Sequence, residues 1–96
     1  MLRIDLNCDL GEGAGQDTEL MPLITSANIA CGAHAGDVMT MRDTIMLALQ
    51  HGVAIGAHPG FADREHFGRR ELKIEPHEAA MLVFEQVQKL QEIAHA

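Results

Sequence analysis

The chain has 96 residues, 47% of them hydrophobic, and a formal net charge of −7 at pH 7. This length and composition indicate one small globular domain spanning residues 1–96. The acidic balance argues against nucleic acid or an anionic membrane as a partner, because both attract clustered Lys and Arg. The sequence has no apolar run long enough to span a membrane and no targeting pattern at its start, so we expect a cytoplasmic protein.

The two cysteines, Cys8 and Cys31, have no C-x-x-C spacing, and both lie in strand-like surroundings. We therefore expect two buried free thiols rather than a disulfide or a zinc site. A role for either cysteine as a nucleophile is a minor hypothesis.

The chain opens on a strand pattern that leads into a glycine turn. Apolar and polar residues alternate between Leu2 and Asp9, which predicts one apolar face packed on helices and one polar face. The apolar face would carry Leu2, Ile4, Leu6 and Cys8, and the polar face Arg3, Asp5, Asn7 and Asp9. Glu12 follows in a turn whose glycines would let backbone N–H groups approach a ligand. The alternative is a half-exposed edge strand whose acidic side faces solvent.

Helices and strands alternate through the rest of the chain. The pattern predicts a short helix over 17–24, a strand over 26–31, a helix over 38–50, a strand over 53–57 and a helix over 76–94. Asp17 or Thr18 would cap the first helix and Asp37 the second, and Pro76 would open the last. An apolar stripe on the last helix predicts a buried face, made by Ala80, Val83, Phe84, Val87, Leu90 and Ala94.

Two further stretches stand out between these elements. Gly56, inside the third strand, suggests that backbone or ligand approaches closely there. Residues 61–73 have no clear period and carry several charges, which is typical of an active-site loop.

Repeated strand–helix units predict an α/β fold with a parallel sheet, and such folds bind ligands at the carboxyl ends of their strands. Three of these ends carry reactive side chains, namely Asp5, Asn7, Asp9 and Glu12 after the first strand, His34 after the second and His58 after the third. A single histidine in such a position is more often a hydrogen-bonded loop residue than a catalyst. Three equivalent positions together favour a functional site.

Four sequence blocks resemble the LamB/YcsF family, and the resemblance covers essentially the whole chain. The blocks are Asp-Leu-Asn-Cys-Asp-Leu-Gly-Glu-Gly at 5–13, Thr-Ser-Ala-Asn-Ile-Ala-Cys-Gly-Ala-His-Ala-Gly-Asp at 25–37, His-Gly-Val-Ala-Ile-Gly-Ala-His-Pro-Gly at 51–60 and Phe-Gly-Arg-Arg-Glu at 67–71. Ala33 and Val38 depart from the family's pattern, which expects an aromatic residue and often a proline there. Family members are more than twice as long, so the resemblance implies a domain that is incomplete relative to them.

The resemblance implies a partial (β/α) barrel related to polysaccharide-deacetylase-like and glycoside hydrolase barrels. It also implies the A subunit of an ATP-dependent 5-oxoprolinase, which hydrolyses 5-oxo-L-proline to L-glutamate with B and C subunits and uses ATP with Mg²⁺. The family motif falls on Asp5, Asn7, Asp9, Glu12, Asn28, His34, Asp37, His58, Arg69 and Arg70.

We assign the motif residues to roles as a hypothesis. The catalytic group comprises Asp5, Asp9, His34 and His58, in which His34 or His58 acts as general base while Asp5 and Asp9 orient the histidines or bind a metal. The substrate-binding group comprises Asn7, Glu12, Asn28, Asp37, Arg69 and Arg70, with the two arginines holding a carboxylate. If a metal is bound, its candidate ligands are Asp9, His34 and His58.

Two other functions stay open at this point. One is a metal-dependent deacetylase or amidohydrolase that needs no ATP, although the sequence has no His-x-x-x-His pair. The other is an inactive assembly or binding module. Because three parallel strands cannot close a barrel, exposed strand edges would also favour self-association.

Overall fold

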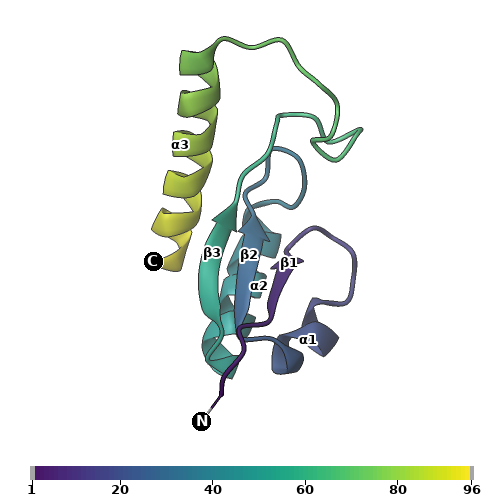
Figure 1. The fold of residues 1–96 in the computed structure, drawn as a ribbon, viewed down its shortest axis with the longest axis vertical. Helices are drawn as coiled ribbons and strands as arrows, with labels where there is room; N and C mark the ends of the chain where they lie inside the picture. The colour runs from purple at the N-terminus through teal and green to yellow at the C-terminus, as the bar shows by residue number, and fades with distance from the viewer. Residues whose placement is uncertain (1, 96) are drawn as a thin grey trace.

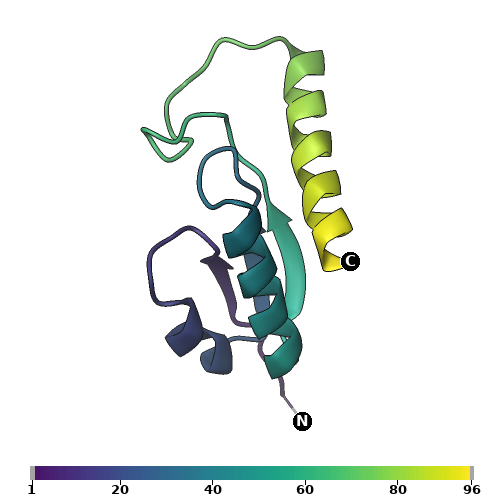
Figure 2. The same cartoon turned by 180° about the vertical axis from the view of Figure 1, so that it is seen from behind.

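The computed structural model describes residues 2–95. Its core is a parallel sheet in the order β1-β2-β3, made by β1 (Asn7–Leu10), β2 (Ser26–Ala30) and β3 (Ala54–His58). The helical elements are α1 (Asp17–Leu20), the short 3₁₀ helix η1 (Met21–Leu23), α2 (Val38–His51) and α3 (Pro76–Ala94). Helix α2 covers one face of the sheet and α3 runs beside β3 (Figures 1 and 2). The predicted α/β fold with parallel βα units is confirmed.

Strand register separates an apolar sheet face from a polar one. Cys8 aligns with Ala27 and Ile55, and the next row on that face comprises Leu10, Ile29 and Ala57. These side chains belong to the core that α2 closes with Met41, Ile45 and Ala48. Because side chains alternate along a strand, Asp9, Asn28 and His58 lie on the opposite face.

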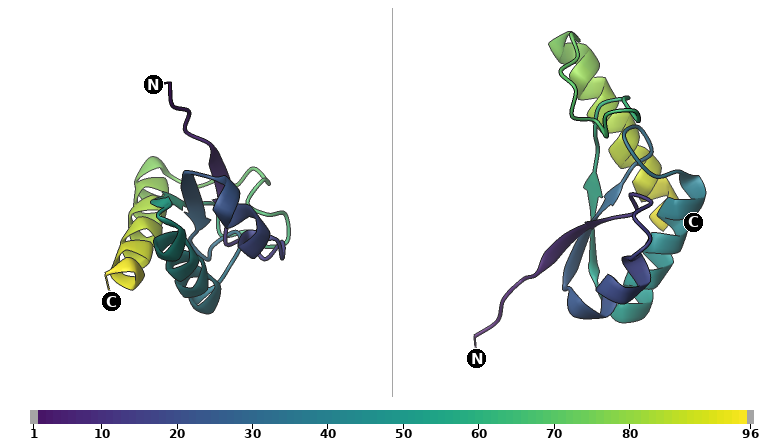
Figure 3. Two further views of the ribbon diagram at one scale, coloured as in Figure 1. Left: turned by 90° about the horizontal axis from the view of Figure 1, so that it is seen from below. Right: turned by 90° about the vertical axis from the view of Figure 1, so that its right-hand side faces the viewer.

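The predicted first strand is too long at its beginning. Leu2, Ile4 and Leu6 are exposed, so the apolar face expected for them is wrong. Figure 3 shows this segment leaving the sheet as an extended arm. The reason is register: β2 begins at Ser26, which already pairs with Asn7, so earlier residues have no strand residue beside them.

The second helix begins and ends where the sequence predicts. The Asp37 side chain accepts a hydrogen bond from the Thr40 N–H at 2.7 Å, and Gly52 adopts a left-handed conformation with φ 66°. The N-cap predicted for the first helix is wrong, because Gln16 holds that position. The Asp17 carboxylate instead accepts from the Gly11 N–H at 3.1 Å and the Thr44 hydroxyl at 3.3 Å, which ties the turn after β1 to α2.

Helix α3 has the predicted bounds, but most of its predicted apolar face is exposed. Leu90 is buried, whereas Val83, Phe84 and Val87 are not, and Phe84 is 61% exposed. Figure 1 shows why: the first half of α3 rises beyond the end of β3, where the sheet no longer lies under it. Among residues 2–95, no helix is both long and apolar enough to cross a membrane.

Candidate functional site

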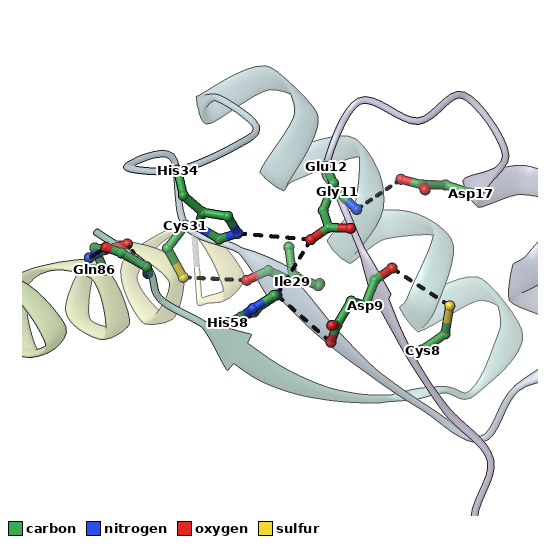
Figure 4. Close-up of polar contacts among 11 residues, drawn as sticks. Cys8, Asp9, Gly11, Glu12, Asp17, Ile29, Cys31, His34, His58 and Gln86 are labelled. Carbon is green, nitrogen blue, oxygen red and sulfur yellow. Dashed lines mark hydrogen bonds and ion pairs between the residues drawn. The ribbon is translucent and has the colours of Figure 1, made fainter. Parts of the chain in front are cut away.

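The carboxyl end of the sheet brings four reactive side chains together (Figure 4). Asp9 lies in β1, Glu12 in the turn after it, His34 in the loop after β2, and His58 ends β3. Glu12 Oε2 lies 3.8 Å from His34 Nε2 and 3.6 Å from His58 Nδ1, and Asp9 Oδ1 lies 3.7 Å from the same His58 nitrogen. The imidazole rings are tilted by 58° with centroids 4.8 Å apart. We call Asp9, Glu12, His34 and His58 the strand-end cluster.

The strand-end cluster forms one wall of a pocket of about 290 Å³. The opposite wall comes from the segment that follows β3. Besides the cluster, the lining residues are Pro59, Gly60, Phe67, Gly68 and Arg69. Two neighbouring carboxylates, two imidazoles and one guanidinium make this pocket polar and suit it to proton transfer or to metal binding.

His34 is the most buried member of the cluster, with 3% of its surface exposed. Burial, together with the nearby His58 charge, lowers the pKa of His34 below its usual 6.5, although the carboxylates of Glu12 and Asp9 act in the opposite direction. Within residues 2–95, neither ring nitrogen of His34 has a hydrogen-bond partner, and the same is true of His58 Nδ1. His34 is therefore neutral near pH 7 and has lone-pair capacity to accept a proton or bind a metal.

Glycines let the backbone close tightly around His34. A Cβ atom at Gly60 would collide with the His34 ring, and one at Gly68, where φ is 73°, would lie 2.7 Å from His34 Cβ. Gly56 is also closely approached, but by the Asn28 side chain, which fills the space where a Cβ would stand, and not by the backbone or ligand that the sequence suggested. These glycines allow a compact site that larger residues would open.

Two residues without an assigned role in the sequence interpretation hold the pocket's second wall. Gln86 of α3 is buried and makes hydrogen bonds to both backbone groups of Gly60. Its side chain accepts from the Gly60 N–H at 3.0 Å and donates to the Gly60 carbonyl at 2.8 Å. Asp63 is 4% exposed and lies 3.2 Å from His66 Nδ1 and 3.4 Å from Arg70 Nη2. A polar residue on the apolar side of α3 was the one available sequence signal for Gln86.

The Asp63 carboxyl has a lowered pKa. Burial alone would raise it, but the hydrogen bond from His66 and the charge of Arg70 outweigh that effect. Its backbone carbonyl also accepts from the Gly68 N–H at 2.8 Å, so Asp63 organises the turn that presents Phe67.

Phe67 has a left-handed backbone with φ 57°, a conformation that bulky residues rarely adopt. Its ring meets His34 edge-on at 5.4 Å, and the Arg69 guanidinium lies 5.7 Å from its centroid. This unusual backbone therefore places Phe67 between the most buried histidine and the arginine at the pocket wall. Strained residues of this kind tend to gather at functional sites.

The structure separates the predicted site residues into two groups. Asp9, Glu12, His34, His58 and Arg69 line one pocket. The others lie outside that pocket, namely Asp5, Asn7, Asn28, Asp37 and Arg70. Of these, Asn28 sits on the polar sheet face beside Asp9, Asp37 caps α2, and Arg70 pairs with Asp63.

The expected position of Asp5 and Asn7 at the carboxyl end of β1 is wrong. Both lie at the opposite end, where Asp5 Oδ1 accepts from the Thr25 hydroxyl at 2.5 Å and the Ser26 hydroxyl at 2.9 Å. The Asn7 amide donates to Ser26 Oγ at 2.9 Å. The error follows from the strand's true start at Asn7, which puts Asp5 before the strand.

Cys31 is buried, as predicted, whereas Cys8 is only half-buried, and both thiols are free within the described part of the chain. Burial is the main cause that raises the pKa of each thiol, which keeps it protonated and poorly nucleophilic.

Comparison with known proteins identifies the family. The LamB/YcsF family matches residues 4–96. The chain belongs to the LamB/YcsF family. It is 56% identical over 101 aligned positions to the A subunit of 5-oxoprolinase from Brevibacillus brevis, an alignment that covers 100% of this chain and 40% of that protein.

The fold of this LamB/YcsF chain closely matches a solved structure. The lactam utilization protein from Thermus thermophilus superposes with a TM-score of 0.92 at 43% identity, over 96% of this chain and 39% of that one. The three parallel strands described here therefore match the arrangement of the corresponding part of that structure. The chain thus spans about two fifths of the length of these relatives.

Proposed function

We propose that this chain acts as part of the A component of an ATP-dependent 5-oxoprolinase, hydrolysing 5-oxo-L-proline to L-glutamate together with B and C subunits. The similarity to a protein named as the A subunit of 5-oxoprolinase supports the reaction, and the protein named for lactam utilization supports the substrate class. One structural observation carries the proposal: the pocket joins a neutral buried imidazole and two carboxylates to the Arg69 guanidinium.

Hydrolysis of a lactam breaks its C–N bond. Water supplies the hydroxyl to the carbonyl carbon and a proton to the nitrogen, so the site must remove one proton and deliver one. The strand-end cluster offers groups for both transfers, because each of its carboxylates lies 3.6–3.8 Å from at least one imidazole nitrogen. The pocket's enclosed side, around His34, is where we place the reacting carbonyl.

Arg69, rather than Arg70, is the proposed partner of the substrate carboxylate. Arg69 lines the pocket and stacks near Phe67, whereas Arg70 pairs with Asp63 outside it. A guanidinium can hold a carboxylate by two parallel hydrogen bonds. This arrangement would orient the ring of 5-oxoproline so that its lactam carbonyl reaches the cluster.

The pocket does not suit the triphosphate of ATP. Asp9 and Glu12 would repel it, and Arg69 is the single lysine or arginine among the described residues that line the pocket. We therefore propose that ATP with Mg²⁺ binds elsewhere in the complete assembly, and we assign no step of its chemistry to these residues.

Exposed apolar surface supports assembly with other chains and self-association. Val83 and Phe84 are exposed on α3, and β1 and β3 are the sheet's outer strands in the described part of the chain. We expect the isolated chain to associate at micromolar concentration, as measured by light scattering. A compact monomer would contradict this expectation.

A chimera gives the sharpest test of the reaction. We would replace the matching segment of the A subunit from Brevibacillus brevis with this chain's sequence, add B and C subunits, and measure glutamate formed from 5-oxoproline and ATP. Turnover near that of the parent enzyme supports the proposal. A folded chimera that assembles but is silent, beside an active parent, contradicts it and favours a binding module.

A metal-dependent amidohydrolase or deacetylase without ATP is the second candidate, favoured by the convergence of Glu12, His34 and His58. The same chimera discriminates the two, because amide hydrolysis that continues when ATP is omitted would support the second candidate alone.

A further inference from the structure

We propose that Glu12, His34 and His58 form a binding site for one zinc ion or a similar divalent transition metal. One donor atom from each residue lies within 4.8 Å of the others. Tetrahedral zinc with bonds of about 2.0–2.1 Å places its ligand atoms about 3.4 Å apart. The separations of 3.6 and 3.8 Å from Glu12 Oε2 to the two histidine nitrogens are close to that spacing.

The histidine nitrogens supply a second, independent observation. His34 is more than nine-tenths buried, yet both its ring nitrogens lack a partner in residues 2–95, and so does His58 Nδ1. Buried polar atoms normally find hydrogen bonds. His34 Nε2 and His58 Nδ1 both lie near Glu12 Oε2, so these two nitrogens indicate a missing partner at that point. His66 shows the contrast, because its Nδ1 lies 3.2 Å from Asp63 and is satisfied.

The donor set selects the class of metal. Two imidazoles and one carboxylate suit zinc and its first-row neighbours, whereas Mg²⁺ and Ca²⁺ prefer oxygen ligands alone. A cation would also offset the two carboxylates of Glu12 and Asp9, against which the pocket wall sets only the Arg69 charge among the described residues. Three protein ligands leave a fourth position open toward the pocket.

The catalytic role of this metal rests on the proposed hydrolysis of a lactam, because the metal would activate the attacking water. Zinc lowers the pKa of a bound water to about 7. In this arrangement the histidines act as ligands, and Asp9, which is 50% exposed beside His58, is the group positioned to accept the water's proton. Glu12, expected from the sequence to bind substrate, is reassigned to the metal.

Metal binding by the 96-residue chain tests the inference without using turnover. After dialysis against a chelator, titration with ZnCl₂ followed by calorimetry and elemental analysis should show one equivalent bound, with MgCl₂ failing to compete. The variants Glu12→Gln, His34→Asn and His58→Asn should each weaken zinc binding at least about 100-fold. His66→Asn and Cys8→Ser are matched controls and should bind as the parent does.

Nitrogen NMR of the unaltered chain keeps the test valid if His34→Asn fails to fold. Zinc should shift the imidazole resonances of His34 and His58 and leave those of His51, His66, His77 and His95 in place. Absence of stoichiometric binding, or equal binding by the ligand variants and the controls, would overturn the inference. A silent chimera with intact zinc binding would instead count against the proposed reaction alone.

Discussion

The two ends of the same three-stranded sheet use acidic residues in opposite ways. At the amino end, Asp5 Oδ1 accepts hydrogen bonds from the hydroxyls of Thr25 and Ser26. At the carboxyl end, Glu12 faces two histidines at 3.6–3.8 Å, beyond hydrogen-bonding distance, and ring nitrogens stay without partners in the described chain. Satisfied hydrogen bonds characterise a structural link, whereas convergent unsatisfied groups characterise a site that binds something else.

This contrast shows why an acidic residue near a strand is ambiguous in the sequence. Asp5 and Asp9 belong to the same alternating pattern and would share a strand face, yet they serve different ends of the sheet. The difference depends on where pairing with β2 begins. The same kinds of substitution made at both ends of the sheet therefore test whether the two ends differ in function.

The largest expected difference is in turnover of the complete enzyme. Changing Asp9, His34 or His58 to alanine in the chimera should each lower glutamate formation by about 10²-fold or more, because each removes a group of the strand-end cluster. Asp5→Ala should leave turnover close to that of the parent chimera. If Asp5→Ala lowered glutamate formation as much as the strand-end variants do, with normal folding and assembly, the two ends of the sheet would not differ in function.

A second prediction concerns the loop after β3, which α3 holds in place. Gln86→Leu removes both hydrogen bonds to the backbone of Gly60 and should lower the free energy of unfolding by about 1–3 kcal/mol. Gln86→Glu keeps the acceptor for the Gly60 N–H but sets a buried carboxylate against the carbonyl oxygens of Gly60 and Leu82, so it should lose at least as much. Urea unfolding monitored by circular dichroism would measure both, and unchanged stability in the leucine variant would refute this role.

The two ends should also lose stability in different pH ranges. Burial lowers the pKa of His34 below its usual 6.5, so the unfolded chain binds its proton first and stability falls as pH drops below about 6.5. The Thr25 and Ser26 hydrogen bonds lower the pKa of Asp5 below its usual 3.8. The stabilisation that the Asp5 carboxylate gives the folded chain is therefore complete above pH 3.8 and is lost as pH falls through the folded-state pKa.

Thermal unfolding from pH 8 to pH 3 in metal-free buffer would separate these contributions. His34→Asn should flatten the curve as pH falls below about 6.5, and Asp5→Asn should change it only near and below the usual aspartate pKa of 3.8. Identical curves for the two variants would mean that the ends do not differ in this respect.

The smallest effect is expected at Asp37, which caps α2 and whose pKa is lowered mainly by the Thr40 N–H. Asp37→Ala should lower the melting temperature by a few degrees, and Asp37→Asn should nearly restore it, because asparagine caps helices as well as aspartate does. Turnover should not change with either variant. A large loss of activity in the asparagine variant would return Asp37 to the substrate-binding group.

Most secondary structure was predictable because its signals are local. Asp37 and Gly52 mark the ends of α2, Pro76 marks the start of α3, and apolar runs between glycines mark β2 and β3. His34 and His58 could be placed at one sheet edge, since the carboxyl ends of parallel strands share that edge. These predictions need no knowledge of distant contacts.

Periodicity, helix capping and motifs were enough to predict the order of the βα units, the alternation of side chains along each strand and the family. The start of β1, the arginine that reaches the pocket and the position of Glu12 beside the histidines became clear only from the folded chain. It also revealed Gln86 and Asp63 as supports of the pocket wall. These features depend on register and on contacts between segments far apart in the chain, which no local pattern encodes.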